Sequence, residues 1–285
     1  MNTLMKFQQQ RGMSLVELLI AMLLGTMLIA GAVKIFSSNS QALRLQQQVS
    51  STQETARLTM ELLQADLRRA GQGGTLGVGV RPVIGWNDWS AAGSFPGLLA
   101  SSDVVRIGYL APEAMTDCEG NVAQAGDTIE NTYSVGLDTN PGIAALFCDG
   151  RVVSTAGAVI AGGAGWPGVA LLRGLESFQV NFGTRPAPAA GGRADVNGYG
   201  SPQAYVRPAV SGNTTTALVV SIRFGMVVRS EQGIQGVQAP ANAIPLLDTT
   251  LTAAAMAATK IDNKFPVHRV FVKTVALRNT AIGTL

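Results

Sequence analysis

The sequence predicts an α+β protein in which one long N-terminal helix packs on an antiparallel β-sheet. Residues 41–70 contain neither proline nor glycine, and their apolar side chains recur every three or four positions, as on one face of a helix. Beyond Ala70 the period changes to two, most clearly in Leu218–Val228. The 33 glycines and 12 prolines favour short strands joined by turns over a helical bundle.

The chain begins with a polar stretch, residues 1–12, that carries Lys6 and Arg11. An apolar run, Met13–Val33, follows at once. A helix of about 21 residues spans about 31 Å, which matches the hydrocarbon core of a bilayer. Positive charge ahead of the run places the N-terminus in the cytoplasm and the rest of the chain on the other side. The run is therefore predicted to cross a membrane.

Glu17 interrupts this apolar run. An ionisable group in such a position is costly unless it is paired, so it calls for a functional explanation. An ordinary signal peptide, cut at Gly25-Thr26 or Ala30-Gly31, would leave Glu17 unexplained. A glutamate whose side chain reaches the membrane surface is the simpler alternative.

The junction Gly12-Met13-Ser14-Leu15-Val16-Glu17, followed by a membrane-length apolar run, resembles the leader of type IV pilins and type II secretion pseudopilins. The resemblance implies cleavage after Gly12 by a prepilin peptidase and N-methylation of Met13. Met13 stands where the family usually has phenylalanine. The resemblance also implies an assembly role for Glu17, whose carboxylate would meet the Met13 amine of a neighbouring subunit. Pairing of this kind offsets the desolvation of both charges.

The helical pattern continues to Ala70. Its predicted buried stripe consists of Ala42, Leu45, Val49, Thr52, Ala56, Met60, Leu63, Leu67 and Ala70. On the opposite face Arg57 and Glu61 stand four residues apart, a spacing that allows an ion pair. Arg68 and Arg69 are expected in the last turn, and Gly71 supplies the stop. Met13–Ala70 would form one helix of about 58 residues, roughly 87 Å long.

Four segments follow from these patterns. Residues 1–12 are a cleaved leader, 13–33 the transmembrane half of the helix, 34–70 its amphipathic half, and 71–285 a β-rich globular domain. The clearest strands are Leu218–Val228, Phe178–Phe182 and His268–Leu277, with weaker candidates at Val104–Tyr109 and Leu146–Val153. The amphipathic half of the helix is expected to cover one side of their sheet. Residues 185–212 and 232–266 are predicted loops, the second with a short helix at Ala253–Ala258.

Cys118 and Cys148 are the two cysteines. If the globular domain lies outside the cytoplasm, they are expected to form a disulfide. Closing a loop of that size would stabilise the fold by roughly 3–4 kcal/mol. Two buried free thiols are the alternative.

The residue inventory argues against an enzyme, a metal site or a cofactor. His268 is the single histidine, so neither a histidine-based triad nor a multi-histidine metal site can be built. Gly71-Gln72-Gly73-Gly74 lacks the rest of a phosphate-binding motif. The carboxylates of Asp117 and Glu119 are expected to be solvated. Asp195-Val196-Asn197-Gly198 is only faintly similar to a calcium loop, because ligands downstream are missing.

Nucleic-acid binding is not expected either, although the sequence pI is about 9.1. Without Lys6 and Arg11 the formal charge falls from +3 to about +1. The remaining basic residues are scattered along the sequence, whereas nucleic-acid affinity needs them clustered on one face.

Within the family, the stretch Arg269–Asn279 looks like the end of PilW-type minor pilins, which are related to the minor pseudopilin J of type II secretion. The resemblance implies a pilin-like fold and a minor pilin of a type IV pilus, the filament used in twitching motility. Such a subunit helps to initiate assembly at the tip.

Implied partners are other minor and major pilins, prepilin peptidase, the assembly platform and a tip adhesin. It would sit in the inner membrane, with a periplasmic globular domain, and then in the pilus. The alternatives are a minor pseudopilin and a signal-anchored binding protein or adhesin.

Overall fold

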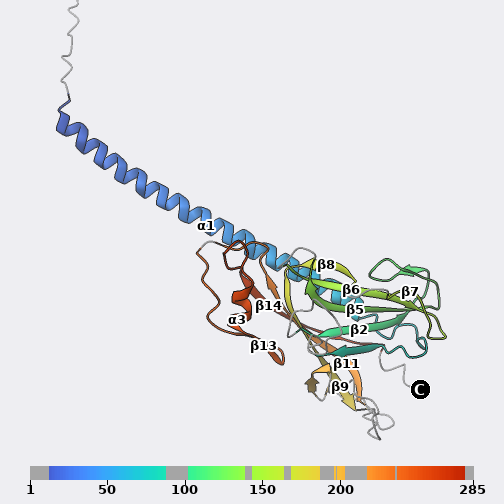
Figure 1. Cartoon of the computed structure of the whole chain (residues 1–285). Coiled ribbons are helices and arrows are strands. Elements are labelled where there is room, and N and C mark those ends of the chain that lie inside the picture. Colours follow the sequence, from blue (N-terminus) through green and yellow to red (C-terminus); the bar gives the residue numbers. More distant parts are fainter. Residues whose placement is uncertain are drawn as a thin grey trace, which may run out of the picture. The chain divides into compact units, whose positions relative to one another are not determined.

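The structure is a computed structural model that describes residues 13–87, 102–138, 143–163, 168–186, 196, 198–202, 217–234 and 236–279. One long helix comes first and is followed by a strand-rich remainder (Figure 1). The chain divides into two units, residues 1–47 and 48–285. The expected leader, including Gly12, lies outside the described residues, and so does most of the predicted loop 185–212.

Helix α1 is one unbroken element, Leu15–Leu67, and it belongs to both units (blue in Figure 1). The helix ends three residues before the predicted end at Ala70, so Arg68 and Arg69 lie in the following turn and not in the last helical turn. Two tight turn bonds explain the early end, because Arg69 N donates to Asp66 O and Ala70 N to Leu67 O. Gly71 then turns away at φ +73° and donates its N–H to Gly108 O.

The buried face of α1 begins later than the sequence pattern predicts. Thr52, Ala56, Leu63 and Leu67 are buried as expected, and Ala70 is buried just beyond the helix. Ala42 and Leu45 are exposed, contrary to the prediction. Both lie in the unit of residues 1–47, whose described residues are all part of α1 or of the two residues before it. A single helix has nothing within its own unit against which to bury a face.

The larger sheet has six antiparallel strands in the order β1-β2-β5-β6-β7, with β8 also paired to β6. Its strands are β1 (Val83–Trp86), β2 (Val104–Leu110), β5 (Thr128–Leu137), β6 (Ala144–Val153), β7 (Val159–Gly162) and β8 (Val169–Arg173). The two weaker candidates of the sequence, near Val104 and Leu146, are therefore real strands. Strand β5, between them, was not predicted.

The second sheet has four antiparallel strands in the order β10-β9-β11-β14. They are β9 (Leu175–Pro186), β10 (Gly198–Gly200), β11 (Ala217–Arg229) and β14 (His268–Ala276). The three clearest strands of the sequence are β9, β11 and β14. Short elements complete the fold: the hairpins β3 (Met115–Thr116) with β4 (Val122–Ala123) and β12 (Ile244–Leu246) with β13 (Thr249–Leu251), and helix α3 (Ala253–Ala258) at the predicted position.

The main core joins the buried face of α1 to both sheets. Leu63 from the helix, Ile129 from β5, Phe178 from β9 and Phe224 from β11 are fully buried in one cluster. The predicted packing of a long helix on antiparallel strands is confirmed, although the strands form two main sheets and not one. The back of β11 is covered where Val227 packs in a second cluster with Leu246, Leu251 and Met256 of β12, β13 and α3.

Candidate functional site

Three parts of the described chain carry polar groups in unusual settings: the start of α1, the last turn of the same helix and one end of the smaller sheet. At the start, Glu17 lies in the first turn, where the helix dipole favours a negative charge. The backbone N–H groups of Glu17 and Leu18 both donate to Ser14 O, at 3.0 and 3.2 Å. The side chain of Glu17 is exposed, and no described residue forms an ion pair with it. Met13 lies just before the helix and is also exposed.

The surface around Glu17 is apolar on every side of the helix. Exposed side chains include Leu15, Leu19, Met22, Leu23, Leu28, Ile29, Val33 and Phe36. Leu28 is 76% exposed and Phe36 is 74% exposed. A helix that is apolar all round requires lipid or other apolar helices as its surroundings. By length and composition, α1 could cross a membrane.

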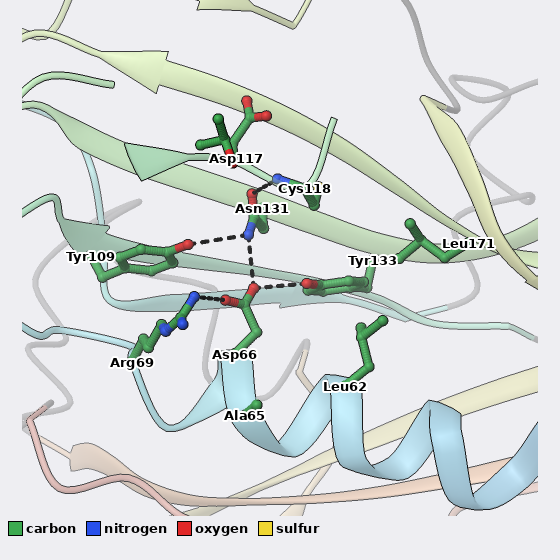
Figure 2. A pocket seen from close by; sticks show the side chains of 11 residues that line it. Leu62, Ala65, Asp66, Arg69, Tyr109, Asp117, Cys118, Asn131, Tyr133 and Leu171 are labelled. Atoms are coloured by element: carbon green, nitrogen blue, oxygen red, sulfur yellow. Dashed lines mark hydrogen bonds and ion pairs between the residues drawn. The ribbon is translucent and has the colours of Figure 1, made fainter. Parts of the chain in front are cut away.

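At the other end of α1, Asp66 is 6% exposed and accepts hydrogen bonds from two strand residues of β5. Tyr133 Oη donates to Asp66 Oδ2 at 2.7 Å, and Asn131 Nδ2 donates to the same oxygen at 2.8 Å. The guanidinium of Arg69 lies 3.6 Å from Asp66 Oδ1. Figure 2 shows Arg69 reaching Asp66 from the turn after the helix, and Asn131 and Tyr133 from the sheet above. These bonds offset the desolvation of a buried carboxylate.

Asn131 also connects this cluster to the disulfide. The structure joins Cys118 to Cys148 of β6, with their Cα atoms 6.2 Å apart. Cys118 N donates to Asn131 Oδ1 at 3.3 Å, while the amide nitrogen of Asn131 reaches Asp66 (Figure 2). The backbone around the disulfide thus holds Asn131 in the orientation that suits the helix carboxylate.

Asp117 shapes the hairpin that carries Cys118. Its Oδ1 accepts from the backbone N–H groups of Glu119 and Asn121, at 2.9 and 2.8 Å, and its Oδ2 accepts from Asn121 Nδ2 at 2.8 Å. The expectation that Asp117 is solvated was wrong, because the tight loop between β3 and β4 buries it as a backbone acceptor.

A pocket of about 290 Å³ opens between α1, the larger sheet and this hairpin. It is lined by Leu62, Ala65, Asp66, Arg69, Tyr109, Thr116, Asp117, Cys118, Asn131, Tyr133 and Leu171. Its walls combine two carboxylates, one guanidinium and two phenols with short apolar surfaces (Figure 2). Arg69 is paired with Asp66, and Asp117 is held by the hydrogen bonds of its own loop, so the pocket offers mainly hydrogen bonds.

The two phenols of the pocket are held neutral. Burial raises the pKa of Tyr109 to about 12, and the nearby Asp66 carboxylate adds to this shift. Burial also raises the pKa of Tyr133 well above its usual value, again with a contribution from Asp66. Both tyrosines therefore act as hydrogen-bonding groups at neutral pH and not as bases.

A second buried charge cluster lies at one end of the smaller sheet. Glu176 of β9 lies 3.2 Å from Arg229 of β11 and 2.7 Å from His268 of β14, and all three side chains are almost fully buried. The expectation that His268 is structural agrees with this position, because the three residues join the ends of three neighbouring strands. No group of three or more His, Cys, Asp or Glu side chains suited to a metal occurs among the described residues. Asp195 and Asn197, the faint calcium pattern, lie outside them.

The family model of type IV pilus-assembly protein W, PilW, matches residues 132–279, more than half of the chain. The chain belongs to the PilW family. The model of the prokaryotic N-terminal methylation motif matches residues 7–33, a range that contains Gly12, Met13 and Glu17. A solved type IV-like pilin from Thermus thermophilus shares 14% identity over 80% of this chain and 97% of that chain, with a TM-score of 0.37. No curated protein matches.

Membership of the PilW family confirms the resemblance inferred from the sequence and assigns the protein to the type IV pilus system. PilW proteins are structural and not enzymatic. The methylation motif together with the apolar start of α1 indicates membrane anchoring. The PilW match runs from β5 to beyond β14, so it includes Tyr133 and all three residues of the Glu176 cluster.

Sequence reasoning missed Asp66 and its partners Tyr109, Asn131 and Tyr133. A signal for Asp66 was present, because a carboxylate at this position falls on the same helical face as Leu63 and Ala70. Strand β5 was harder to recognise, since its sequence TIENTYSVGL is largely polar although nine of its ten positions are buried.

Proposed function

We propose that this PilW protein is a minor pilin subunit of a type IV pilus. The observation that carries the proposal is Glu17, an acid in the first turn of a helix whose surroundings are exposed and apolar. Within the described residues it has no partner, and the apolar surface around it excludes water once it is in lipid or among other helices. An isolated carboxylate is unstable in such surroundings, so its partner must come from another molecule or from the new chain end.

The processing steps follow from the methylation motif. Prepilin peptidase would cut after Gly12 and leave Met13 as the N-terminal residue, whose amine is then methylated. A methylated amine keeps its positive charge at neutral pH. That amine of one subunit can therefore neutralise Glu17 of its neighbour, and the attraction brings a new subunit into register as it leaves the inner membrane.

The same proposal sets the location and the partners. The N-terminus starts in the cytoplasm and the strand-rich unit in the periplasm, before the subunit moves into the pilus. Its neighbours are other minor pilins and major pilins, and the assembly platform acts on it. A position near the tip, where a minor pilin helps to start assembly and can carry an adhesin, follows from the family resemblance.

Replacing Gly12 with valine tests the processing step. The β-branched side chain enlarges the residue before the cut, so Gly12→Val should leave the leader attached and remove the protein from sheared filaments. Intact-mass measurement of the purified full-length protein checks this. Gly31→Val is the matched control, because a side chain at Gly31 meets nothing within 4 Å in the monomer and lies away from the junction. Normal piliation by Gly12→Val would refute the proposed maturation.

Crosslinking mass spectrometry on intact cells distinguishes the pilus from a secretion machinery. Crosslinks to pilus subunits are expected. Crosslinks only to components of a type II secretion system would make the protein a minor pseudopilin, and a fully processed chain that joins no assembly would make it an anchored binding protein.

A further inference from the structure

Strand β14 forms one edge of the smaller sheet, and its two sides differ. Its inner side pairs with β11 from Ser221↔Ala276 to Arg229↔His268. No described strand pairs with its outer side. Flanking hydrogen bonds fix which backbone groups point outward, since Leu277 N donates to Val220 O and Ser230 N donates to Val267 O. Odd-numbered residues therefore bond to β11, and the N–H and C=O groups of residues 268, 270, 272, 274 and 276 face outward.

The outward-bonding positions also carry exposed β-branched side chains. Val270 is 38% exposed, Val272 is 51% exposed, and Thr274 is exposed as well. They lie two residues apart and so on one face of the strand. A regular, exposed apolar edge is a template for pairing with another chain, and soluble monomers usually shorten, cover or bend such an edge. Strand β14 is nine residues long and pairs with β11 without a bulge, so the edge is neither shortened nor bent, and its charged side chains are Arg269 and Lys273.

The charge of this edge restricts what can pair with it. Residues 268–278 contain Arg269, Lys273 and Arg278 and no aspartate or glutamate. Arg269 and Lys273 lie on the odd-numbered face, opposite to that of Val270 and Val272. A second copy of β14 would bring these cations close to their own copies, and like charges facing each other across strands are destabilising. A strand with acidic residues at the matching positions would be attracted.

We propose that β14 is a docking edge for an extended segment of a different pilus subunit. The segment would add a strand to the sheet, with apolar or β-branched residues beside Val270 and Val272 and acidic residues beside Arg269 and Lys273. Backbone hydrogen bonds to the outward groups would give affinity, and the alternating side chains would give specificity. The inference rests on the proposed role as a filament subunit and names the surface through which the strand-rich unit joins its neighbour.

Val272→Pro tests the edge while keeping the pairing with β11. The N–H of residue 272 faces outward, so proline removes a donor from the free edge and leaves the bonds to β11 in place. The full-length variant should be about tenfold less abundant in sheared filaments, the effect of losing roughly 1.4 kcal/mol of association energy. Val272→Thr keeps the N–H and the branched shape, and it should stay within about twofold of wild type.

Charge reversal tests the chemistry of the partner. Lys273→Glu should reduce incorporation about fivefold, because it places a carboxylate beside the acidic residues of the added strand, whereas Lys273→Gln should have a smaller effect. A photo-crosslinker at position 272 identifies the strand itself. The crosslink should map to an extended segment of another pilin with an acidic residue within two positions. A map to a helix, or to β14 of a second copy, would overturn the inference.

The outcomes separate this inference from the proposed function. If wild type and Val272→Pro enter filaments equally, the edge does not dock and the inference fails, while the filament role stands. If wild type itself never enters filaments, the proposed function fails. Thermal unfolding of Val272→Pro in detergent shows whether this variant has a folding defect. If it has one, the Lys273→Glu and Lys273→Gln variants and the crosslink map test the docking edge instead.

Discussion

Two of the acids of helix α1, one near each end, have opposite surroundings. Asp66 lies in the unit of residues 48–285, where Tyr133, Asn131 and Arg69 of the same chain satisfy it. Glu17 lies in the unit of residues 1–47, among exposed apolar side chains, with no ion pair from any described residue. The comparison separates two uses of a carboxylate in an apolar setting. Asp66 is satisfied by groups of its own chain, whereas Glu17, under the proposed function, is neutralised by the amine of a neighbouring subunit.

Replacing each of the two acids with alanine tests this difference with the largest expected effects. Asp66→Ala leaves the hydroxyl of Tyr133 and the amide of Asn131 without their acceptor, so the free energy of unfolding should fall by about 3 kcal/mol. Glu17→Ala should leave unfolding unchanged and instead reduce the amount of protein in sheared filaments. Thermal unfolding of the full-length proteins in detergent, together with filament fractionation, measures both effects.

Glu61→Ala is the matched control for this pair, because Glu61 is an exposed acid of the same helix whose contact with Arg57 spans 3.6 Å. It should change neither readout, since exposed ion pairs contribute little. A stable Asp66→Ala protein, or a Glu17→Ala protein that enters filaments as well as wild type, would remove the distinction.

Tyr133→Phe is a smaller change that tests one hydrogen bond of Asp66. It removes one 2.7 Å hydrogen bond to a buried carboxylate and keeps the ring, so the expected loss is about 1–2 kcal/mol. Tyr109→Phe should cost less, because the hydrogen bond that its hydroxyl accepts from Asn131 is longer, at 3.4 Å. Chemical denaturation of the two variants side by side tests this order. Equal losses would mean that packing, and not the bond to Asp66, sets the effect of Tyr133.

Raising the pH should lower the free energy of unfolding gradually through the two phenols of the same cluster. The pKa of Tyr109 is raised to about 12 and that of Tyr133 is also raised, so the folded state keeps phenolic protons that the unfolded chain releases near pH 10. Stability from these groups is complete below pH 10 and is lost as pH rises through the folded values. Between pH 10 and 12 the free energy of unfolding should fall by up to about 1.4 kcal/mol per pH unit for each phenol.

Tyr133→Phe supplies the check on that slope. Its stability should decline less steeply above pH 10 than that of wild type. The same slope in both proteins would show that Tyr133 does not keep its proton in the folded state.

The sequence predicts the helix, the change of period after Ala70 and the strands whose apolar residues alternate, such as β9, β11 and β14. It predicts the end of the helix less well, because Gly108, 37 positions away along the chain, accepts the bond that turns Gly71 aside. It misses β5 because Asn131, Thr132 and Ser134 look like loop residues until a helix carboxylate and neighbouring strands surround them. The Asp66 pocket depends on contacts between residues 66 and 133, which no local pattern displays.

The proposal for Glu17, by contrast, rests on a short sequence motif and needs no long-range contacts. A glycine, an apolar first residue and an acid at a fixed spacing can be recognised without tertiary structure. The methylation motif that matches residues 7–33 contains all three of these positions.

The bonds around Asp66 have a mechanical consequence within the unit of residues 48–285. Tension applied along the part of α1 in this unit cannot be carried by the helix alone, because the helix ends at Leu67. The load must then pass sideways through the buried face of the last turns, where Asp66 bonds to the middle of β5, and from there through Asn131 to the hairpin that the disulfide fastens to β6. A pull along the helix axis would stretch several of these bonds at the same time. The end of the helix is therefore held firmly against the sheet.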